Sequence, residues 1–207
     1  DWSTGEILAA LRRLGLDRNT LVVWTPDNGA VRHQPPQGSN APYKGWAYDT
    51  SEAAMRVPCL MRWPGRIPAG SERKELFTQV DLMATLAAAA GVPLPRGASP
   101  DGASELAAFT DPAHAPALRT ETLFLGTGGF ALRQGEWVYL PKQGSCGMTV
   151  QVPPGAPWGQ PYARLGLTNS DVDAQGKIHP GAPPVQLYNL ATDPGQATNV
   201  AAAEPQR

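Results

Sequence analysis

The sequence predicts an α/β domain followed by a small antiparallel β subdomain. Two observations predict the first part: a helical apolar pattern leads directly into a continuous apolar run at residues 20–25, and this order is typical of an α/β unit. A third observation predicts the second part, because residues 119–207 contain short strand-like runs bounded by turn residues. Gly and Pro number 22 each, so we expect long, irregular loops between the elements.

The first part is expected to contain two helices and two strands. Residues 3–14 predict a helix, because an S-x-x-E capping box opens it and apolar residues follow at helical spacing. Thr20–Thr25 and Arg56–Trp63 are apolar runs that predict two strands of one mainly parallel sheet. Thr78–Ala90 predicts the second helix, which a glycine and a proline end.

Residues 94–118 are rich in Ala, Pro, Gly, Ser and Asp, and they predict a linker or loop. The subdomain that follows is expected to contain antiparallel strands, with a hairpin turn at Gln134-Gly135. Its candidate strands are Glu121–Leu125, Phe130–Arg133, Glu136–Leu140 and Val185–Leu190.

Composition excludes several classes of protein. Lys and Arg number 17 and Asp and Glu 18, so the net charge of -1 leaves no basic excess for nucleic-acid binding. No apolar run approaches the roughly 20 residues that cross a bilayer. Cys59 and Cys146 form neither a disulfide framework nor a metal-type pair, and Cys59 is expected in the core because it stands in an apolar strand.

Asp27-Asn28-Gly29 follows the first apolar strand directly. Ligands of open α/β sheets bind beyond the carboxyl ends of the strands, and oxygen ligands suit Ca²⁺ or Mg²⁺. Asp27 and Asn28 are therefore candidate metal ligands. The alternative is a plain turn, since Asx-Gly pairs are common in turns.

Four further residues are candidates in the segment that follows. Lys44 could bind an anionic substrate as a point charge, and His33 could donate to an anion or relay a proton. The alternative for both is a solvated loop residue. Glu52 and Arg56 stand four residues apart, and they could pair to fix the loop that carries Lys44.

Several motifs follow one another along the chain. They are a strand with D-N-G, a K-G…E-x-x-x-R-V-P segment, R-W-P-G-x-I-P-x-G-S, V-D-L-x-x-T-L and a late L-Y-x-L-x-x-D-P-G. They occupy residues 14–29, 44–58, 62–71, 80–86 and 187–195. In this order the segments resemble the sulfatase family, within the alkaline-phosphatase-like superfamily.

The resemblance implies the C-terminal part of an alkaline-phosphatase-like α/β sandwich at residues 1–93 and a C-terminal subdomain at 119–207. It implies hydrolysis of a sulfate ester on a sulfated small molecule or sugar, with Ca²⁺, or Mg²⁺ in its place, held by Asp27 and Asn28. Lys44 would hold the sulfate and stabilise charge on the leaving group. A periplasmic or secreted location is favoured by the same resemblance.

The family's nucleophile is a formylglycine made within a C/S-x-P-x-R motif, and this sequence has no such motif. We therefore expect the nucleophile and the remaining metal ligands in an N-terminal part of the same protein, and an inactive chain without it. Both ends look cut, which favours a piece of a longer protein. Two alternatives stay open: a phosphoric or phosphonic ester hydrolase of the same superfamily, and a non-catalytic fragment that serves assembly or binding.

Overall fold

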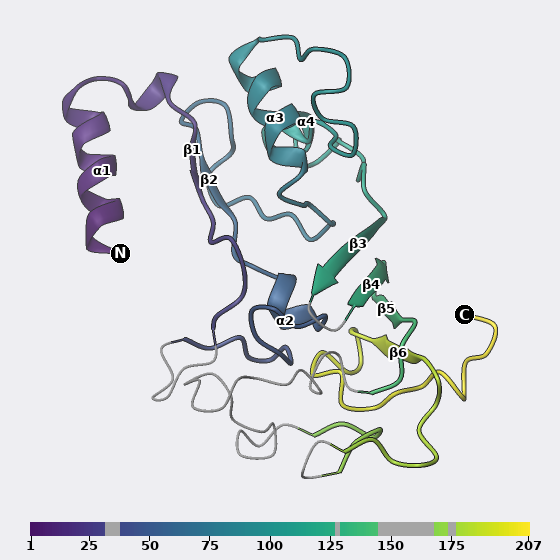
Figure 1. Cartoon of the computed structure of the whole chain (residues 1–207). Helices are drawn as coiled ribbons and strands as arrows, with labels where there is room; N and C mark the ends of the chain where they lie inside the picture. Colours follow the sequence, from purple (N-terminus) through teal and green to yellow (C-terminus); the bar gives the residue numbers. More distant parts are fainter. Residues whose placement is uncertain (32–37, 127–128, 145–167, 174–176) are drawn as a thin grey trace. The chain divides into compact units, whose positions relative to one another are not determined.

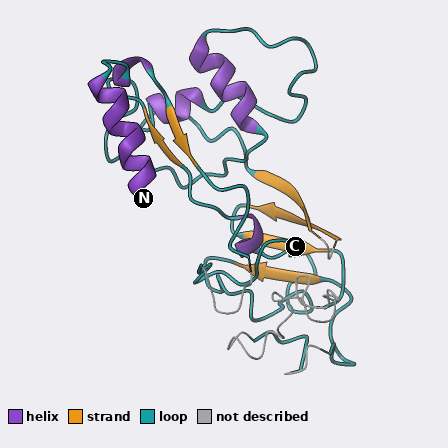
Figure 2. Cartoon of the chain, turned by 60° about the vertical axis from the view of Figure 1, so that its left-hand side comes forward, coloured by secondary structure: helices purple, strands orange, loops and turns teal. Residues whose placement is uncertain are grey.

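The computed structural model describes residues 1–31, 38–126, 129–144, 168–173 and 177–207, and it divides the chain into two compact units. Unit 1 comprises residues 1–25 and 58–120, and unit 2 comprises residues 26–57 and 121–207. Unit 1 holds most of the helical residues, whereas unit 2 is built around a four-stranded sheet (Figures 1 and 2). None of the described helices has the length and apolar character needed to span a membrane.

Unit 1 begins with the predicted helix, α1 (Trp2–Arg13). Two arginines occupy its last turn, where positive charge complements the helix dipole. Gly15 follows with φ 67°, a conformation that glycine adopts at little cost. The expected capping box does not form, because α1 already starts at Trp2 and Ser3 lies inside it. A short 3₁₀ helix, η1 (Asp17–Asn19), leads on to the first strand.

The two predicted strands of unit 1 are present as β1 (Val22–Trp24) and β2 (Leu60–Arg62). They pair in an antiparallel register, with Val23 opposite Met61, so the expected parallel arrangement is wrong. The apolar runs identified the strands correctly, but apolar content carries no information about strand direction. A parallel pair also needs a crossover connection, usually a helix, and the only described helix between these strands has four residues.

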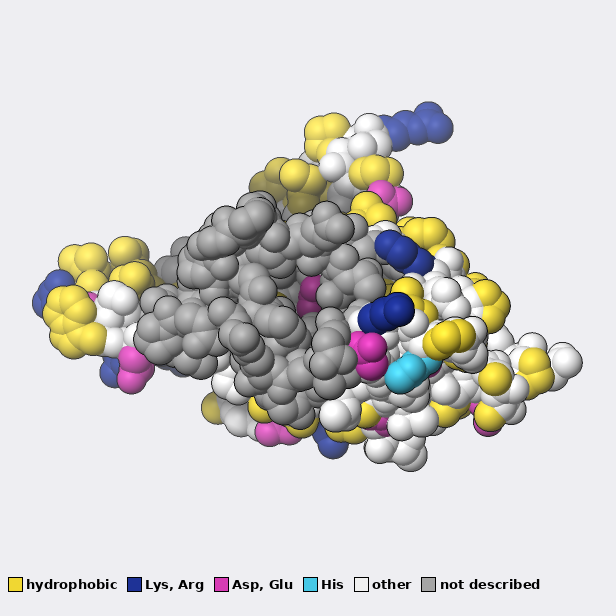
Figure 3. All heavy atoms as spheres, turned by 60° about the horizontal axis from the view of Figure 1, so that its bottom comes forward, with side chains coloured by type: hydrophobic (Ala, Val, Ile, Leu, Met, Phe, Trp, Pro, Cys, Tyr) yellow, Lys and Arg dark blue, Asp and Glu magenta, His cyan; other side chains and the backbone are white. Residues whose placement is uncertain are grey.

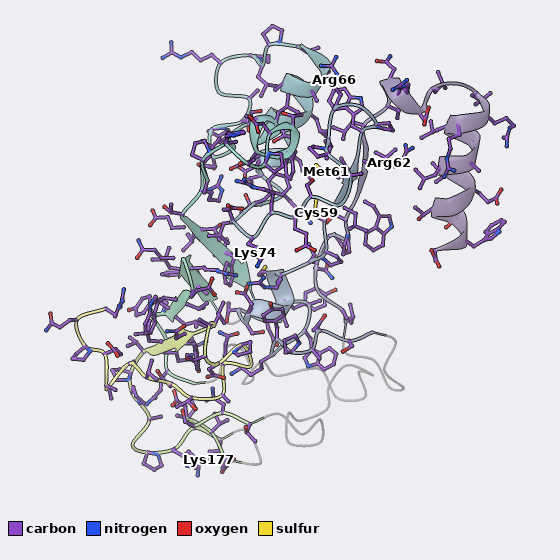
Figure 4. All side chains as sticks on the ribbon, turned by 180° about the vertical axis from the view of Figure 1, so that it is seen from behind. Cys59, Met61, Arg62, Arg66, Lys74 and Lys177 are labelled. Atoms are coloured by element: carbon purple, nitrogen blue, oxygen red, sulfur yellow. The ribbon has the colours of Figure 1, made fainter. Side chains whose placement is uncertain are left out.

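Cys59 precedes β2, and its side chain is exposed rather than part of the core (Figure 4). The assignment to the core was therefore wrong. The strand is shorter than the apolar run, and β2 begins one residue later, at Leu60. Partial burial still raises the pKa of the Cys59 thiol.

The second predicted helix is α3 (Asp81–Ala90), which ends at Gly91 with φ 68° as the sequence indicates. The Asp81 carboxylate accepts hydrogen bonds from Thr78 N at 3.0 Å and from Thr78 Oγ1 at 2.7 Å, next to the helix start. A further short helix, α4 (Leu106–Thr110), lies within the segment expected as a linker. It is held partly by an edge-to-face contact of Phe109 with Phe77, with ring centroids 5.1 Å apart.

Unit 2 contains the predicted antiparallel sheet, in the order β3-β4-β5-β6. Gly135, with φ 57°, occupies the turn between β4 and β5, which confirms the hairpin. The strands are β3 (Glu121–Gly126), β4 (Gly129–Gln134), β5 (Trp137–Leu140) and β6 (Gln186–Asn189).

The two faces of this sheet differ in burial. The inner face carries the core of unit 2, together with the buried polar residues Arg133 and Gln186. The outer face leaves Leu123, Leu125 and Phe130 exposed, and hydrophobic side chains are visible at several places on the surface in Figure 3. The core cluster consists of Ala131, Val138, Leu140, Tyr188 and Leu190, with Phe124 packed against it.

Candidate functional site

The D-N-G segment begins at the second residue of unit 2, three positions after the last residue of β1. The Asp27 side chain is exposed and the Asn28 side chain is half-buried. Asn28 Nδ2 donates to the carbonyl of Gly29 at 2.8 Å, which leaves Asn28 Oδ1 as the atom that can meet a cation. A carboxylate and an amide oxygen on adjacent residues fit a hard divalent cation, although they supply only two of its about six to eight ligands.

Gly29 fixes this segment against α2 (Glu52–Met55), a helix that was not predicted from the sequence. The Gly29 amide donates to the carbonyl of Ala54 at 2.9 Å. A Cβ at Gly29 would stand 1.8 Å from the carbonyl oxygen of Ala53, so only glycine fits. The D-N-G is therefore more than a surface turn, because its third residue is packed onto a helix.

Asn40 holds the ends of the following loop together. Its Oδ1 accepts from Ala30 N at 2.8 Å, and its Nδ2 donates to the carbonyl of Gly45 at 2.9 Å. Ala47 N donates to the carbonyl of Ala30 at 3.1 Å, and Gly45 has φ 109°. These bonds join the residues after the D-N-G to the residues after Lys44.

Lys44 is buried, with 1% of its surface exposed. Its Nζ donates to the backbone carbonyl of Gln196 at 2.5 Å and lies 5.1 Å from the centroid of the Tyr188 ring. The interpretation of Lys44 as a solvated loop lysine is therefore wrong. This contact could not be predicted from the sequence, because the two partners are 152 residues apart.

Glu52 is also buried, and it accepts hydrogen bonds from two arginines. Arg56 NH2 lies 2.7 Å from Glu52 Oε1, which confirms the expected pair. The second arginine, Arg133 of β4, donates from NH1 to the same oxygen, and sequence reasoning missed it. Gln196 Oε1 accepts from the backbone amide of Glu52 at 2.8 Å, so α2 is held at its first residue by the C-terminal segment.

The predicted role of His33 has no structural outcome, because His33 lies outside the described residues, as does Cys146. Within the described ranges, no group of three or more His, Cys, Asp and Glu side chains could hold a metal ion. A cation at Asp27 and Asn28 would need further ligands besides these two residues.

Comparisons with known proteins relate this chain to sulfatases. The family model described as Sulfatase matches residues 1–92. An N-acetylgalactosamine-6-O-sulfatase of Bacteroides thetaiotaomicron is 30% identical over 218 residues, covering 100% of this chain and 37% of the relative. A steryl-sulfatase of Rattus norvegicus is 44% identical over 108 residues, covering 49% of this chain and 19% of the relative. The chain thus spans well under half the length of these relatives.

Solved structures show the same likeness. One, described with the metabolism of multiple glycosaminoglycans by Bacteroides thetaiotaomicron, has a TM-score of 0.69 and 27% identity, over 99% of this chain and 40% of that chain. A sulfatase from Pseudoalteromonas sp. has a TM-score of 0.69 and 23% identity over 95% of this chain and 36% of that chain, which supports the fold alone. The fold is that of the C-terminal part of an alkaline-phosphatase-like protein with its small antiparallel subdomain. Residues 1–92 thus match the Sulfatase family model, and the chain as a whole is similar to sulfatases.

Proposed function

We propose that this chain forms the C-terminal part of an enzyme that hydrolyses sulfate esters, with Asp27 and Asn28 as ligands of Ca²⁺. The observation that carries the proposal is the D-N-G segment, fixed on α2 through Gly29, in a chain that aligns over its whole length with a sulfatase. A bound divalent cation would act as a Lewis acid on a sulfate oxygen. The oxygen donors present fit that ion, and the phosphoric or phosphonic ester alternative has no comparable support.

The nucleophile and the other metal ligands are proposed to come from an N-terminal part of the same protein. The sequence contains no C/S-x-P-x-R motif in which a formylglycine would form. Unit 1 also has features of an incomplete domain. Among the described residues β1 pairs only with β2, α1 buries none of its residues, and Trp24 and Leu60 are 45% and 64% exposed. A two-stranded sheet alone is marginally stable in water, so unit 1 has edges and apolar surface for further chain to cover.

The proposed substrate is a sulfated sugar. The relative that aligns with the whole chain is named an N-acetylgalactosamine-6-O-sulfatase, and the steryl-sulfatase match covers 49% of this chain. The roles of Lys44 and His33 toward the sulfate stay predictions. Lys44 Nζ uses one of its three N–H donors in the hydrogen bond to Gln196, and an anion would have to reach this buried group. The division into residues 1–93, 94–118 and 119–207 also stays a prediction.

The experiment is an assay of a complete polypeptide that contains this chain, with 4-nitrophenyl sulfate and 4-nitrophenyl phosphate as substrates. We expect hydrolysis of the sulfate in preference to the phosphate, loss of activity with a chelator, and recovery with Ca²⁺. Preferential hydrolysis of the phosphate would favour the other branch of the superfamily. No hydrolysis of either ester, with the formylglycine verified by mass spectrometry, would contradict the proposal.

A further inference from the structure

We propose that Gln196 and Arg133 are positioning residues for the Asp27–Asn28 pair. Both belong to the C-terminal part of unit 2, far from the D-N-G in sequence, and both bind α2. Because α2 in turn holds Gly29, these residues fix the backbone that carries the two candidate ligands. The link to a metal rests on the proposed function, whereas the link to the D-N-G backbone does not.

Gln196 is the residue through which the C-terminal segment reaches α2. It is 0% exposed, and its Oε1 accepts from Glu52 N at 2.8 Å. Its backbone carbonyl accepts from Lys44 Nζ at 2.5 Å and from Asn169 Nδ2 at 2.9 Å. Gln196 has φ 47°, a left-handed conformation that a non-glycine residue keeps only where its surroundings impose it.

Arg133 supports α2 from the inner face of the sheet. Its NH1 donates to Glu52 Oε1, and its Nε donates to the carbonyl of Gly135 at 2.9 Å. The side chain of Arg133 is 10% exposed and that of Glu52 is 3% exposed, so this ion pair lies away from water. Loss of one partner from such a pair leaves a buried charge without compensation, which costs far more than loss of a surface pair.

The close fit between α2 and Gly29 carries the effect to the candidate ligands. The Ala54 carbonyl binds the Gly29 amide at 2.9 Å, and the position of a Gly29 Cβ lies 1.8 Å from Ala53 O. The two backbones are in such close contact that a shift of α2 must move Gly29. Asn28 moves with it, because its Nδ2 is bonded to the Gly29 carbonyl.

The test uses the isotopically labelled 207-residue chain and NMR. Gln196→Met keeps most of the side-chain volume and removes the acceptor for the Glu52 amide, and Arg133→Lys keeps the charge and removes the guanidinium. Arg73→Met is the matched control, because Arg73 pairs with Glu75 and binds backbone carbonyls within unit 1. Amide exchange at Gly29 is compared with exchange in β4 and β5. The same substitutions are also made in a complete polypeptide that contains this chain, and the dependence of sulfate ester hydrolysis on the CaCl₂ concentration is measured.

We expect Gln196→Met to speed Gly29 exchange about tenfold or more while β4 and β5 exchange stays unchanged, and we expect a smaller effect of the same kind for Arg133→Lys. Half-maximal activity of the complete polypeptide should then need several-fold more Ca²⁺, and Arg73→Met should change neither readout. Unchanged Gly29 exchange in both unit 2 variants, or an equal rise across β4 and β5, would overturn the proposal. If sulfate ester hydrolysis by the unsubstituted complete polypeptide does not depend on Ca²⁺, the metal proposal loses its support, and Gly29 exchange still decides the positioning role.

Discussion

Asp81→Asn should destabilise unit 1 strongly at neutral pH. Asp81 is 0% exposed and accepts hydrogen bonds from Arg119 Nε at 3.0 Å, from Arg119 NH2 at 2.6 Å and from Ala103 N at 2.9 Å, besides those from Thr78. Burial alone would raise the pKa of this carboxyl, but the hydrogen bonds from Arg119, Ala103 and Thr78 outweigh it and lower the pKa from 3.8 to about 2. The substitution removes the charge that these donors stabilise.

The size of the effect follows from the same pKa. A difference of nearly two units between the unfolded and folded states corresponds to roughly 2 kcal/mol of folding stability. The folded-state pKa is depressed, so this contribution is fully present above about pH 5 and is lost progressively as the pH falls through 3.8 toward 2. Asn keeps one acceptor oxygen, but the Arg119 guanidinium loses its counter-charge, so about 2 kcal/mol is a lower estimate at pH 7.

The assay is urea unfolding of the chain and of Asp81→Asn at pH 7 and at pH 3, with hydrogen exchange of residues 78–90 to assign the loss to unit 1. Asp101→Asn is the control, because Asp101 lies in the same unit with an exposed side chain. The difference between Asp81→Asn and the unsubstituted chain should shrink at pH 3. Equal stability at pH 7, or a difference that does not change with pH, would refute the reasoning.

Three other substitutions or reactions test particular contacts. Lys44→Ala should lower the free energy of unfolding, measured with urea, by more than about 1 kcal/mol, because it empties a buried site. The control Lys74→Ala removes an exposed side chain and should change this free energy by no more than about 0.5 kcal/mol. Gly29→Ala should displace α2 and broaden or shift its amide resonances, because the new methyl would overlap the carbonyl of Ala53. Cys59 should react with a thiol reagent in the folded chain, but more slowly than a free thiol at pH 7, because its pKa is raised and less thiolate is present.

Gly5→Ala is the control for Gly29→Ala. It should be tolerated or stabilising, because Gly5 lies inside α1 and a Cβ there meets nothing within 4 Å. Cys59 is measured in a Cys146→Ser background, so that one thiol reacts. The burial of Lys44 would be contradicted if Lys44→Ala were as stable as Lys74→Ala. The close contact of Gly29 with α2 would be contradicted by unchanged α2 resonances in Gly29→Ala, and the exposure of Cys59 by labelling that requires denaturant.

Local sequence signals were sufficient for most elements of the fold. Apolar spacing and a following glycine located α3, and the turn at Gly135 located the hairpin of β4 and β5. Strand direction was not predictable, because an apolar run such as that of β1 suits a buried strand of either orientation. The helix α2 was missed because it has four residues and depends on contacts from distant parts of the chain.

The candidate site was predictable only in part, for the same reason. The Glu52–Arg56 pair could be inferred because its members are four residues apart. Arg133 and Gln196 join the same cluster from 81 and 144 residues away from Glu52, and neither stands in a motif that was singled out for chemistry. Lys44 was predicted to bind an anion, with a solvated loop lysine as the alternative, and its burial against the remote Gln196 carbonyl could not be predicted from the sequence.

The most direct test of a calcium-dependent sulfatase site at the D-N-G is the calcium dependence of sulfate ester hydrolysis by a complete polypeptide that carries Asp27→Ala. Asp17→Ala serves as the control, because Asp17 is an acidic residue of unit 1 that pairs with Arg62. We expect Asp27→Ala to lower kcat/KM for an aryl sulfate by about 100-fold or more and to raise the Ca²⁺ concentration needed for activity, while Asp17→Ala changes neither. Activity and calcium dependence in Asp27→Ala equal to those of the unsubstituted enzyme would contradict the assignment of the metal site.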